Sequence, residues 1–214
     1  MKNILCYGDS NTFGFNTIDG SRFDKNTRWT SLLQKNFNNE YKVINEGMCN
    51  RTGFIDNPNG VLFSSQKHFP QVIMNTNNID LLILWIGTND LQNQYDINNE
   101  QIKLGLTKLI TLAKEKTQKI IIIPPVNLDN KVLNGTFNVL FNETSVKKSQ
   151  GLDNIYKQIA DKNDCFYFDV NKITKPCDID GIHYDKNAHK IIADNLYDFI
   201  KNNKITSQFK RLLT

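Results

Sequence analysis

Four short segments of the sequence carry side chains that can act as nucleophiles, bases or hydrogen-bond donors. In chain order they are Gly8-Asp9-Ser10, the stretch NEGMCNRT at 45–52, Gly87-Thr88-Asn89-Asp90, and Asp180-Gly181-Ile182-His183. A hydroxyl attacks a carbonyl only when a base within hydrogen-bonding distance takes its proton. An imidazole is such a base near neutral pH, because its ordinary pKa is about 6.5. The four segments therefore hold the groups that acyl transfer from an ester requires.

Asp180 and His183 are three positions apart, a spacing that lets the carboxylate reach the imidazole across one turn. In such an arrangement the carboxylate fixes the tautomer of the imidazole, which then takes the proton of the Ser10 hydroxyl. Acyl transfer also needs donors for the oxyanion of the tetrahedral intermediate. The candidates are the backbone N–H of Ser10, a backbone N–H in the Asn50 loop and the side-chain amide of Asn89.

Each segment taken alone also has a purely structural interpretation. A serine in a turn caps a helix more often than it attacks a substrate, and Asn89-Asp90 also fits a helix N-cap or an Asx turn. We interpret Asp9 as a brace of its turn. His68 is interpreted as a surface or helix-start residue, and His189 as a solvated residue of the last helix. Only the combination of the four segments indicates chemistry.

The elements that must position these segments alternate between strands and helices. Short β-rich runs predict strands at 3–7, 42–45, 80–86, 119–123 and 165–170. The runs at 81–86 and 120–123 are continuously apolar, which is typical of parallel strands buried on both faces. Apolar stripes with helical spacing lie near 29–37, 102–113, 152–160 and 188–200. This alternation predicts an α/β fold with three layers, α/β/α, around a five-stranded parallel sheet.

The loops after the strands are where a site is expected, because ligands bind beyond the carboxyl ends of an open parallel sheet. Two long irregular stretches, 53–65 and 124–143, also break the pattern, and such connections are usually functional or mobile. Aromatic residues there either line a pocket or form a small core beneath the loops. From the loops after the strands and from these two stretches, we expect the following residues to line the pocket: Asp9, Phe13, Gly47, Phe54, Phe141 and Ile182.

The composition is that of one globular domain of 214 residues, with 39% hydrophobic and 22% charged residues. The net charge of +4 is scattered, so no nucleic-acid partner is expected. The four cysteines lie far apart without a Cys-x-x-Cys pair, which argues against a zinc site or a disulfide framework. No apolar run approaches the roughly 18 to 20 residues of a membrane span, and none resembles a signal peptide. We therefore expect a cytoplasmic location.

Taken together, the four segments resemble the blocks of the SGNH hydrolases, also called the GDSL esterase/lipase family. GDSNT is similar to the nucleophile block, NEGMCNRT to the second, GTND to the third and DGIH to the last. The resemblance implies a flavodoxin-like sheet and a mechanism without metal or cofactor. It implies Ser10 as nucleophile, His183 as base, Asp180 as the partner of the base, and oxyanion donors at Ser10, Asn50 and Asn89.

The resemblance runs from residue 2 to about residue 200, so we expect a hydrolase domain at 1–200 and an extension of unknown role at 201–214. Arg28-Trp29, the Pro-Pro pair after the fourth strand and the FNVLF stretch look closest to the arylesterase and acetyltransferring branch. Asn50 stands where the family usually has glycine, so its side chain is expected to narrow or polarise the acyl site. Gly47 is the alternative backbone donor.

The expected function is a serine esterase that hydrolyses or transfers short acyl groups, acetyl first, through an acyl-enzyme on Ser10. Its partner is a small-molecule ester, and the similar branch includes homo-oligomers. Alternatives within the family are an acyl-CoA thioesterase or lysophospholipase and a carbohydrate O-deacetylase. An alternative from another class is a non-catalytic flavodoxin-like domain that binds flavin or nucleotide at 8–14. That segment lacks a lysine for phosphate and leaves Asp180 and His183 unexplained.

Overall fold

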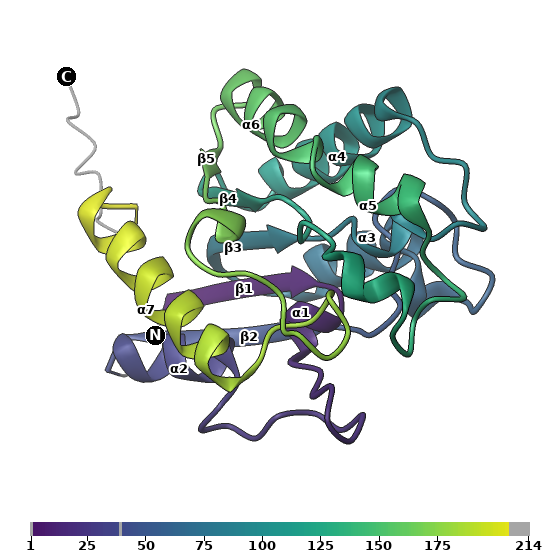
Figure 1. Ribbon diagram of the computed structural model, residues 1–214. Helices are drawn as coiled ribbons and strands as arrows, with labels where there is room; N and C mark the ends of the chain where they lie inside the picture. Colours follow the sequence, from purple (N-terminus) through teal and green to yellow (C-terminus); the bar gives the residue numbers. More distant parts are fainter. Residues whose placement is uncertain (1, 39, 206–214) are drawn as a thin grey trace, which may run out of the picture.

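The computed structural model describes residues 2–38 and 40–205 of the chain. Five parallel strands form one sheet in the order β2-β1-β3-β4-β5 (Figure 1). Their bounds are β1 (Lys2–Gly8), β2 (Tyr41–Gly47), β3 (Ile79–Trp85), β4 (Ile120–Ile123) and β5 (Phe166–Tyr167). The predicted α/β fold with a five-stranded parallel sheet is confirmed.

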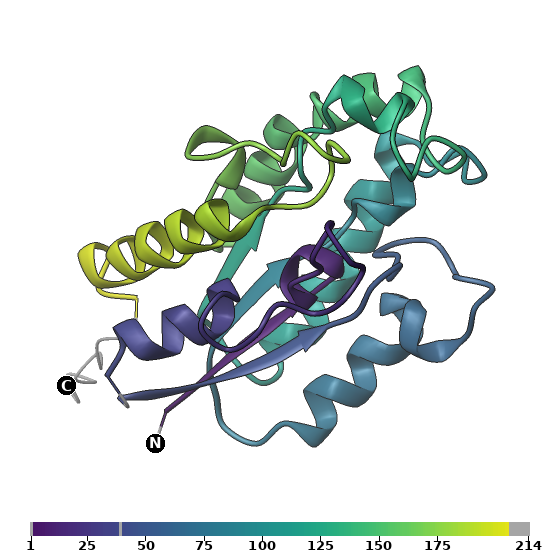
Figure 2. The same ribbon diagram turned by 60° about the horizontal axis from the view of Figure 1, so that its bottom comes forward.

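Helices cover both faces of this sheet and complete the three layers (Figure 2). One layer pairs α2 (Trp29–Asn36) with α7 (Lys186–Asn202), and in the other α4 (Asn99–Lys114) contacts both α3 (Ser65–Asn75) and α6 (Leu152–Lys162). Shorter helices lie in the connections: α1 (Ser10–Phe13), α5 (Glu143–Ser149), η1 (Val61–Phe63), η2 (Asn89–Leu91), η3 (Asn130–Leu133) and η4 (Val170–Lys172).

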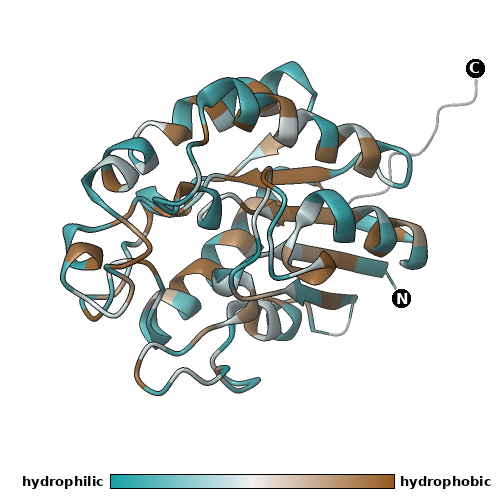
Figure 3. Cartoon of the chain, turned by 90° about the vertical axis from the view of Figure 1, so that its right-hand side faces the viewer, coloured by the Kyte–Doolittle hydropathy of each residue, from teal (hydrophilic) through white to brown (hydrophobic). Residues whose placement is uncertain are grey.

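The central strands are buried because helices cover both of their faces. All four residues of β4 are fully buried, as are the residues from Leu81 to Leu84 in β3. Figure 3 shows this apolar centre between helices whose outer surfaces are hydrophilic. Trp29 and Trp85 are buried with their ring centroids 6.0 Å apart. The sheet is therefore a rigid support for the loops at its carboxyl edge.

The fifth strand is shorter than the predicted run at 165–170. The N–H of Phe168 still donates to the Ile122 carbonyl at 3.0 Å, but the next residue turns the chain away. The side chain of Asp169 accepts from the N–H of Asn171 and begins η4. An Asx turn thus ends the strand where the apolar pattern continues.

Helices α3 and α5 were not predicted; α3 contains Pro70, and α5 is only seven residues long.

The predicted extension at 201–214 is described only as far as Ile205. Helix α7 continues past residue 200 to Asn202, and Ile205 is buried with its N–H bonded to the Ile200 carbonyl. The folded unit therefore includes residues 201–205, and 206–214 lie outside the described residues. In the ranges 2–38 and 40–205, none of the helices has both the length and the apolar character needed to cross a lipid bilayer.

Candidate active site

Ser10 lies where β1 ends and the short helix α1 begins. The turn is closed by Asp9, whose carboxylate accepts from the N–H of Asn11 at 3.0 Å. A Cβ at Gly8 would collide with Thr12 Oγ1 and with the Trp85 carbonyl, so only glycine fits there. Asp9 is completely buried, and burial raises its pKa. It braces the turn and does not line the pocket, contrary to our expectation for the pocket.

Ser10, His183 and Asp180 form one chain of hydrogen bonds across the carboxyl edge of the sheet. Ser10 Oγ lies 2.8 Å from His183 Nε2, and His183 Nδ1 lies 2.6 Å from Asp180 Oδ2. The other carboxylate oxygen of Asp180 accepts from the backbone N–H groups of Ile182 and His183 at 2.9 and 3.0 Å. Burial opposes ionisation of this carboxyl, but the bond to His183 and these N–H groups hold its pKa below the ordinary value. The arrangement can activate the hydroxyl as a nucleophile.

The loop that carries His183 is held in place by its surroundings. The imidazole packs against Phe15 and Phe137, with ring centroids 4.5 and 5.5 Å away. The side-chain amide of Asn11 in α1 donates to the Ile182 carbonyl at 3.3 Å, which ties this loop to the helix of Ser10. Serine and histidine are 173 positions apart in the sequence, so tertiary contacts such as these are needed to set their relative position.

The expected oxyanion donors lie around the same pocket. Asn50 adopts a left-handed backbone with φ 60°, a conformation that asparagine tolerates better than most residues. Among the described residues, no acceptor takes a hydrogen bond from its backbone N–H. Asn50, Asn89 and Ser10 all line the pocket. The alternative donor, Gly47, is wrong: its N–H already donates to Asn45 Oδ1 at 3.0 Å, and it does not line the pocket.

The side chain of Arg51 joins the carboxyl ends of β1 and β2. Its side chain is buried, and Nη1 donates to the carbonyls of Gly8, at 3.0 Å, and Glu46. Its guanidinium also lies 4.4 Å from the centroid of the Tyr7 ring. His68 lies in the first turn of α3 with Nδ1 3.2 Å from Arg51 Nη2; because arginine only donates, this nitrogen is the acceptor. Sequence reasoning assigned no role to Arg51.

Asp90 links the loop after β3 to the loop after β2. Its carboxylate accepts three backbone N–H groups, from Gly53 at 2.6 Å, Phe54 at 2.7 Å and Ile55 at 3.0 Å. Burial raises the pKa of Asp90 to about 7, although these N–H groups favour the carboxylate. Its position directly after Asn89 was the available signal, since a buried acid beside a donor suits a bracing role. Asp90 thereby holds the loops of Asn50 and Asn89, two of the expected oxyanion donors, in one arrangement.

The pocket at Ser10 has a volume of about 290 Å³ and is lined by two chemical kinds of side chain. The apolar lining residues are Phe15, Phe137, Leu140, Phe141 and Ile182. The amide lining residues are Asn50, Asn59, Asn89, Gln92 and Gln94, and Cys49 also lines the pocket. The expected lining residues Phe141 and Ile182 are in place. Sequence reasoning did not point to Gln92, Gln94, Asn59 or Leu140.

Phe13 and Phe54 do not line the pocket, contrary to our expectation. The ring of Phe13 lies 4.5 Å from the guanidinium of Arg22. Phe54 is buried in the layer of α4 and α6, with its ring centroid 6.5 Å from that of Tyr156. Phe13 ends α1 and Phe54 lies in a loop, both close in sequence to site residues, but their side chains have other surroundings. Loop position alone did not distinguish these cases.

Comparison of the sequence with family models decides the family. The model described as GDSL-like lipase/acylhydrolase matches residues 4–196. The chain belongs to this family. Comparison with curated proteins gave no match. The family predicted from the four segments is confirmed, and the chain is an ester hydrolase of the GDSL family.

Solved structures of GDSL-like esterases have the same fold. An inhibitor-bound aryl esterase from M. smegmatis is 26% identical with a TM-score of 0.86, covering 94% of this chain and 99% of that chain. A carbohydrate acetylesterase family member from Sinorhizobium meliloti is 26% identical with a TM-score of 0.88, covering 97% of this chain and 100% of that chain. The similarity therefore extends over nearly the full length of both proteins.

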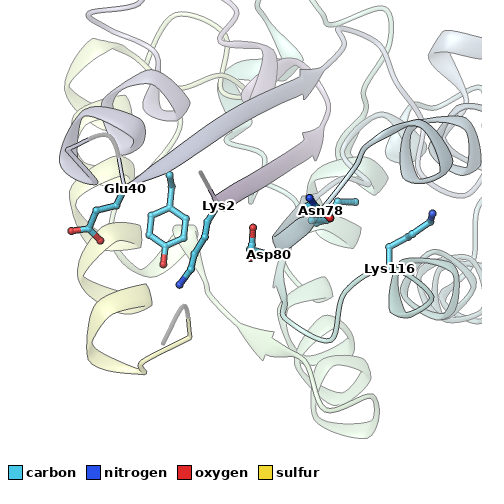
Figure 4. Close-up of a pocket in the computed structure, with 7 residues that line it drawn as sticks. Lys2, Glu40, Asn78, Asp80 and Lys116 are labelled. Atoms are coloured by element: carbon cyan, nitrogen blue, oxygen red, sulfur yellow. The ribbon is translucent and has the colours of Figure 1, made fainter. Parts of the chain in front are cut away.

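A second hollow lies away from the GDSL site. A hollow of about 750 Å³ opens at the amino ends of β1 and β3, the opposite edge from Ser10, and its charged or polar lining includes Lys2, Glu40, Asn78, Asp80 and Lys116 (Figure 4). In the described part of the chain, no three His, Cys, Asp or Glu side chains form a group that could hold a metal ion.

His189 is buried between α7 and α2, so the interpretation of this residue as solvated is wrong. Its Nδ1 accepts from the N–H of Trp29 at 3.2 Å, and its ring contacts Phe23. Burial lowers the pKa of His189 to about 4. The apolar stripe of the last helix did not include this position, because the ring is accommodated by one specific backbone N–H and not by apolar packing alone.

Proposed function

We propose that this protein is a serine esterase that hydrolyses short acyl esters, acetyl esters first, through an acyl-enzyme on Ser10. The observation that carries the proposal is the continuous chain from Ser10 Oγ through His183 to Asp180, with distances of 2.8 and 2.6 Å. A buried carboxylate, an imidazole and a hydroxyl in this geometry match the requirements of nucleophilic acyl transfer. Membership in the GDSL family supports the same reaction class.

The reaction proceeds in two halves. Ser10 Oγ attacks the ester carbonyl carbon while His183 Nε2 takes the hydroxyl proton; the tetrahedral intermediate then expels the alcohol, which receives that proton. In the second half, His183 takes a proton from water, the hydroxide attacks the acyl-enzyme, and Ser10 leaves with the proton. Asp180 stabilises the imidazolium in both halves. Donors at Ser10, Asn50 and Asn89 are assigned to the oxyanion.

The size and lining of the pocket favour a short acyl group and an uncharged alcohol. A volume of about 290 Å³ is just below the roughly 300–1,000 Å³ found for ligand pockets. Among the described residues that line it, none is a lysine or arginine that would bind the phosphates of coenzyme A. The aryl esterase and the carbohydrate acetylesterase similar to this chain support the same choice. A long-chain thioesterase or lysophospholipase is therefore the less favoured interpretation.

A flavin or nucleotide at 8–14 has less support than an ester. The buried carboxylate of Asp9 already accepts from the N–H of Asn11, a group at the start of α1 that a phosphate would need. A negative group in that position also repels a phosphate. The cytoplasmic location and the homo-oligomer stay predictions from the sequence.

The test compares p-nitrophenyl acetate, butyrate and octanoate as substrates for wild type, Ser10→Ala and the control Ser31→Ala on α2. We expect wild type and Ser31→Ala to be most active on acetate, with kcat/KM falling toward octanoate. Ser10→Ala should lose several orders of magnitude, because the three residues act as a unit. Equal activity of wild type and Ser10→Ala would refute the serine mechanism, whereas a preference for octanoate would refute the short-acyl assignment.

A further inference from the structure

Gln92 is one of the amide residues that line the pocket, and it is almost fully buried. Its Nε2 donates to Asn50 Oδ1 at 2.9 Å and to Asn89 Oδ1 at 3.0 Å. Its Oε1 accepts from Gln94 Nε2 at 2.8 Å. Gln92 thus uses both amide hydrogens and its carbonyl oxygen within one network. This network joins the loops that carry two of the assigned oxyanion donors.

One fixed acceptor determines the orientation of every amide in this network. Asn89 Nδ2 donates to the backbone carbonyl of Arg51 at 3.1 Å, and a carbonyl oxygen only accepts. Asn89 must therefore present Oδ1 to Gln92, which obliges Gln92 to present Nε2. The second hydrogen of that nitrogen needs another acceptor, and Asn50 Oδ1 is the atom in reach. Asn50 must then turn its own Nδ2 away from Gln92.

The pocket lining therefore contains side-chain N–H groups that have no acceptor among the described residues. Asn50 Nδ2 has no acceptor among the described residues, and Asn50 lines the pocket. Asn89 Nδ2 carries two hydrogens, and only one of them is used by Arg51. Since an oxyanion accepts and never donates, a flipped Asn89 amide would place a carbonyl oxygen against the developing negative charge.

We propose that Gln92 is a positioning residue that fixes the side-chain amide orientation of Asn89, so that Asn89 presents N–H to the oxyanion. This inference rests on the proposed esterase function for the identity of the negative oxygen. It concerns a residue outside the four segments that carry the family resemblance. Gln92, which directly follows η2, thereby contributes to transition-state stabilisation without contacting the substrate carbonyl.

The isosteric substitution Gln92→Glu separates this role from simple space filling. A carboxylate cannot donate, so it would repel both Oδ1 atoms and favour flipping of the two amides toward it. We expect kcat on p-nitrophenyl acetate to fall about 10²-fold, comparable to the loss of one oxyanion donor. KM should change much less than kcat, because the donors act mainly in the transition state. Gln118→Glu, at the surface after α4, is the matched control and should keep wild-type kinetics.

A double-mutant cycle with Asn89→Ala shows whether Gln92 acts through Asn89. If it does, adding Gln92→Glu to Asn89→Ala should lower kcat by less than about threefold beyond the Asn89→Ala variant. A general disturbance of the fold would instead multiply the two losses. Multiplied losses, or a Gln92→Glu variant with wild-type kcat, would overturn the proposal.

A crystal structure of Gln92→Glu provides a readout that needs no activity. We expect the Asn89 side chain to turn away from the Arg51 carbonyl, which breaks the hydrogen bond that now measures 3.1 Å. An intact hydrogen bond in the variant would overturn the proposed orientation even if the esterase function holds. Conversely, an inactive wild type combined with a displaced Asn89 in the variant would refute the function and leave the orientation argument intact. The two failures are thereby distinguishable.

Discussion

Hydrogen-bond direction decides which residues of the site are interchangeable. Ser10 Oγ must give its proton to His183, whereas the oxyanion must receive hydrogens from N–H groups. In the proposed mechanism Asn89 provides such a group from its side chain, and Asn50 provides one from its left-handed backbone. Substitutions at these positions are therefore expected to affect turnover more than the binding of substrate.

We predict that Asn89→Ala lowers kcat on p-nitrophenyl acetate by roughly 10²- to 10³-fold, because one donor to the oxyanion is lost. Steady-state kinetics measure this, with thermal melting to check that the variant is folded. The control is Asn93→Ala, whose amide donates to the Val139 carbonyl at an exposed position. Wild-type turnover of Asn89→Ala on an ester that the enzyme hydrolyses would show that this side chain is not an oxyanion donor.

Contacts between elements hold the catalytic loops in register. Gly47 in β2 faces the backbone of Phe13 in α1, so closely that a Cβ would collide with it. Asp90 and Arg51 then join the loops after β1, β2 and β3 through backbone groups. Helix α7 contacts α2 through His189 and the N–H of Trp29. The proposed nucleophile is thus supported by neighbours to which the mechanism assigns no chemical step.

The contact of His189 predicts a loss of stability in acid. The folded protein keeps this imidazole neutral with a pKa of about 4, whereas the unfolded chain takes up a proton near the ordinary 6.5. Because the unfolded state binds more protons between these values, the free energy of unfolding falls as the pH drops from about 6.5 to about 4. The expected loss is about 2–3 kcal/mol for a shift of this size.

Urea unfolding at pH 7 and at pH 4.5 measures this effect in wild type and His189→Asn. Asparagine places an oxygen near Nδ1, so it can still accept from the Trp29 N–H, but it does not titrate. We expect the variant to lose much less stability between the two pH values than wild type. An equal loss in both proteins would assign the acid sensitivity to other groups.

The pocket as a whole is formed by loops that are distant in the sequence. Ser10, Asn50, Asn89 and His183 lie on four connections, and Leu140 on a fifth. The sheet brings them together because the carboxyl ends of all its parallel strands meet at one edge. The proposed catalytic groups thus follow the ends of strands, and the long stretch after β4 contributes Phe137, Leu140 and Phe141 to the pocket lining.

We predict that Leu140→Ala enlarges the pocket and shifts specificity toward longer acyl groups. One methylene in an apolar pocket is worth about 1–3 kcal/mol, so kcat/KM for butyrate relative to acetate should rise at least several-fold. The control is Leu104→Ala on α4, where the leucine is exposed to solvent. Competition between the two p-nitrophenyl esters gives the ratio directly. An unchanged ratio in Leu140→Ala would place the acyl chain elsewhere.

The type and spacing of residues were sufficient for the fold class and the family. Apolar runs predict parallel strands because burial on both faces removes alternation, and β1, β3 and β4 follow that rule. The pair Asp180 and His183 was recognisable because its geometry is local: three positions span one turn. Features that depend on neighbours in the sequence were accessible in this way.

Features that depend on distant neighbours were decided by the tertiary structure alone. Phe54 and Phe141 are both aromatic loop residues, yet only Phe141 lines the pocket, because a side chain's direction follows from the packing around it. His189 is neutral and buried because α2 offers it one N–H. The orientation of the amides around Gln92 depends on the Arg51 carbonyl. The sequence by itself determined which groups are available, and only the fold determined their partners.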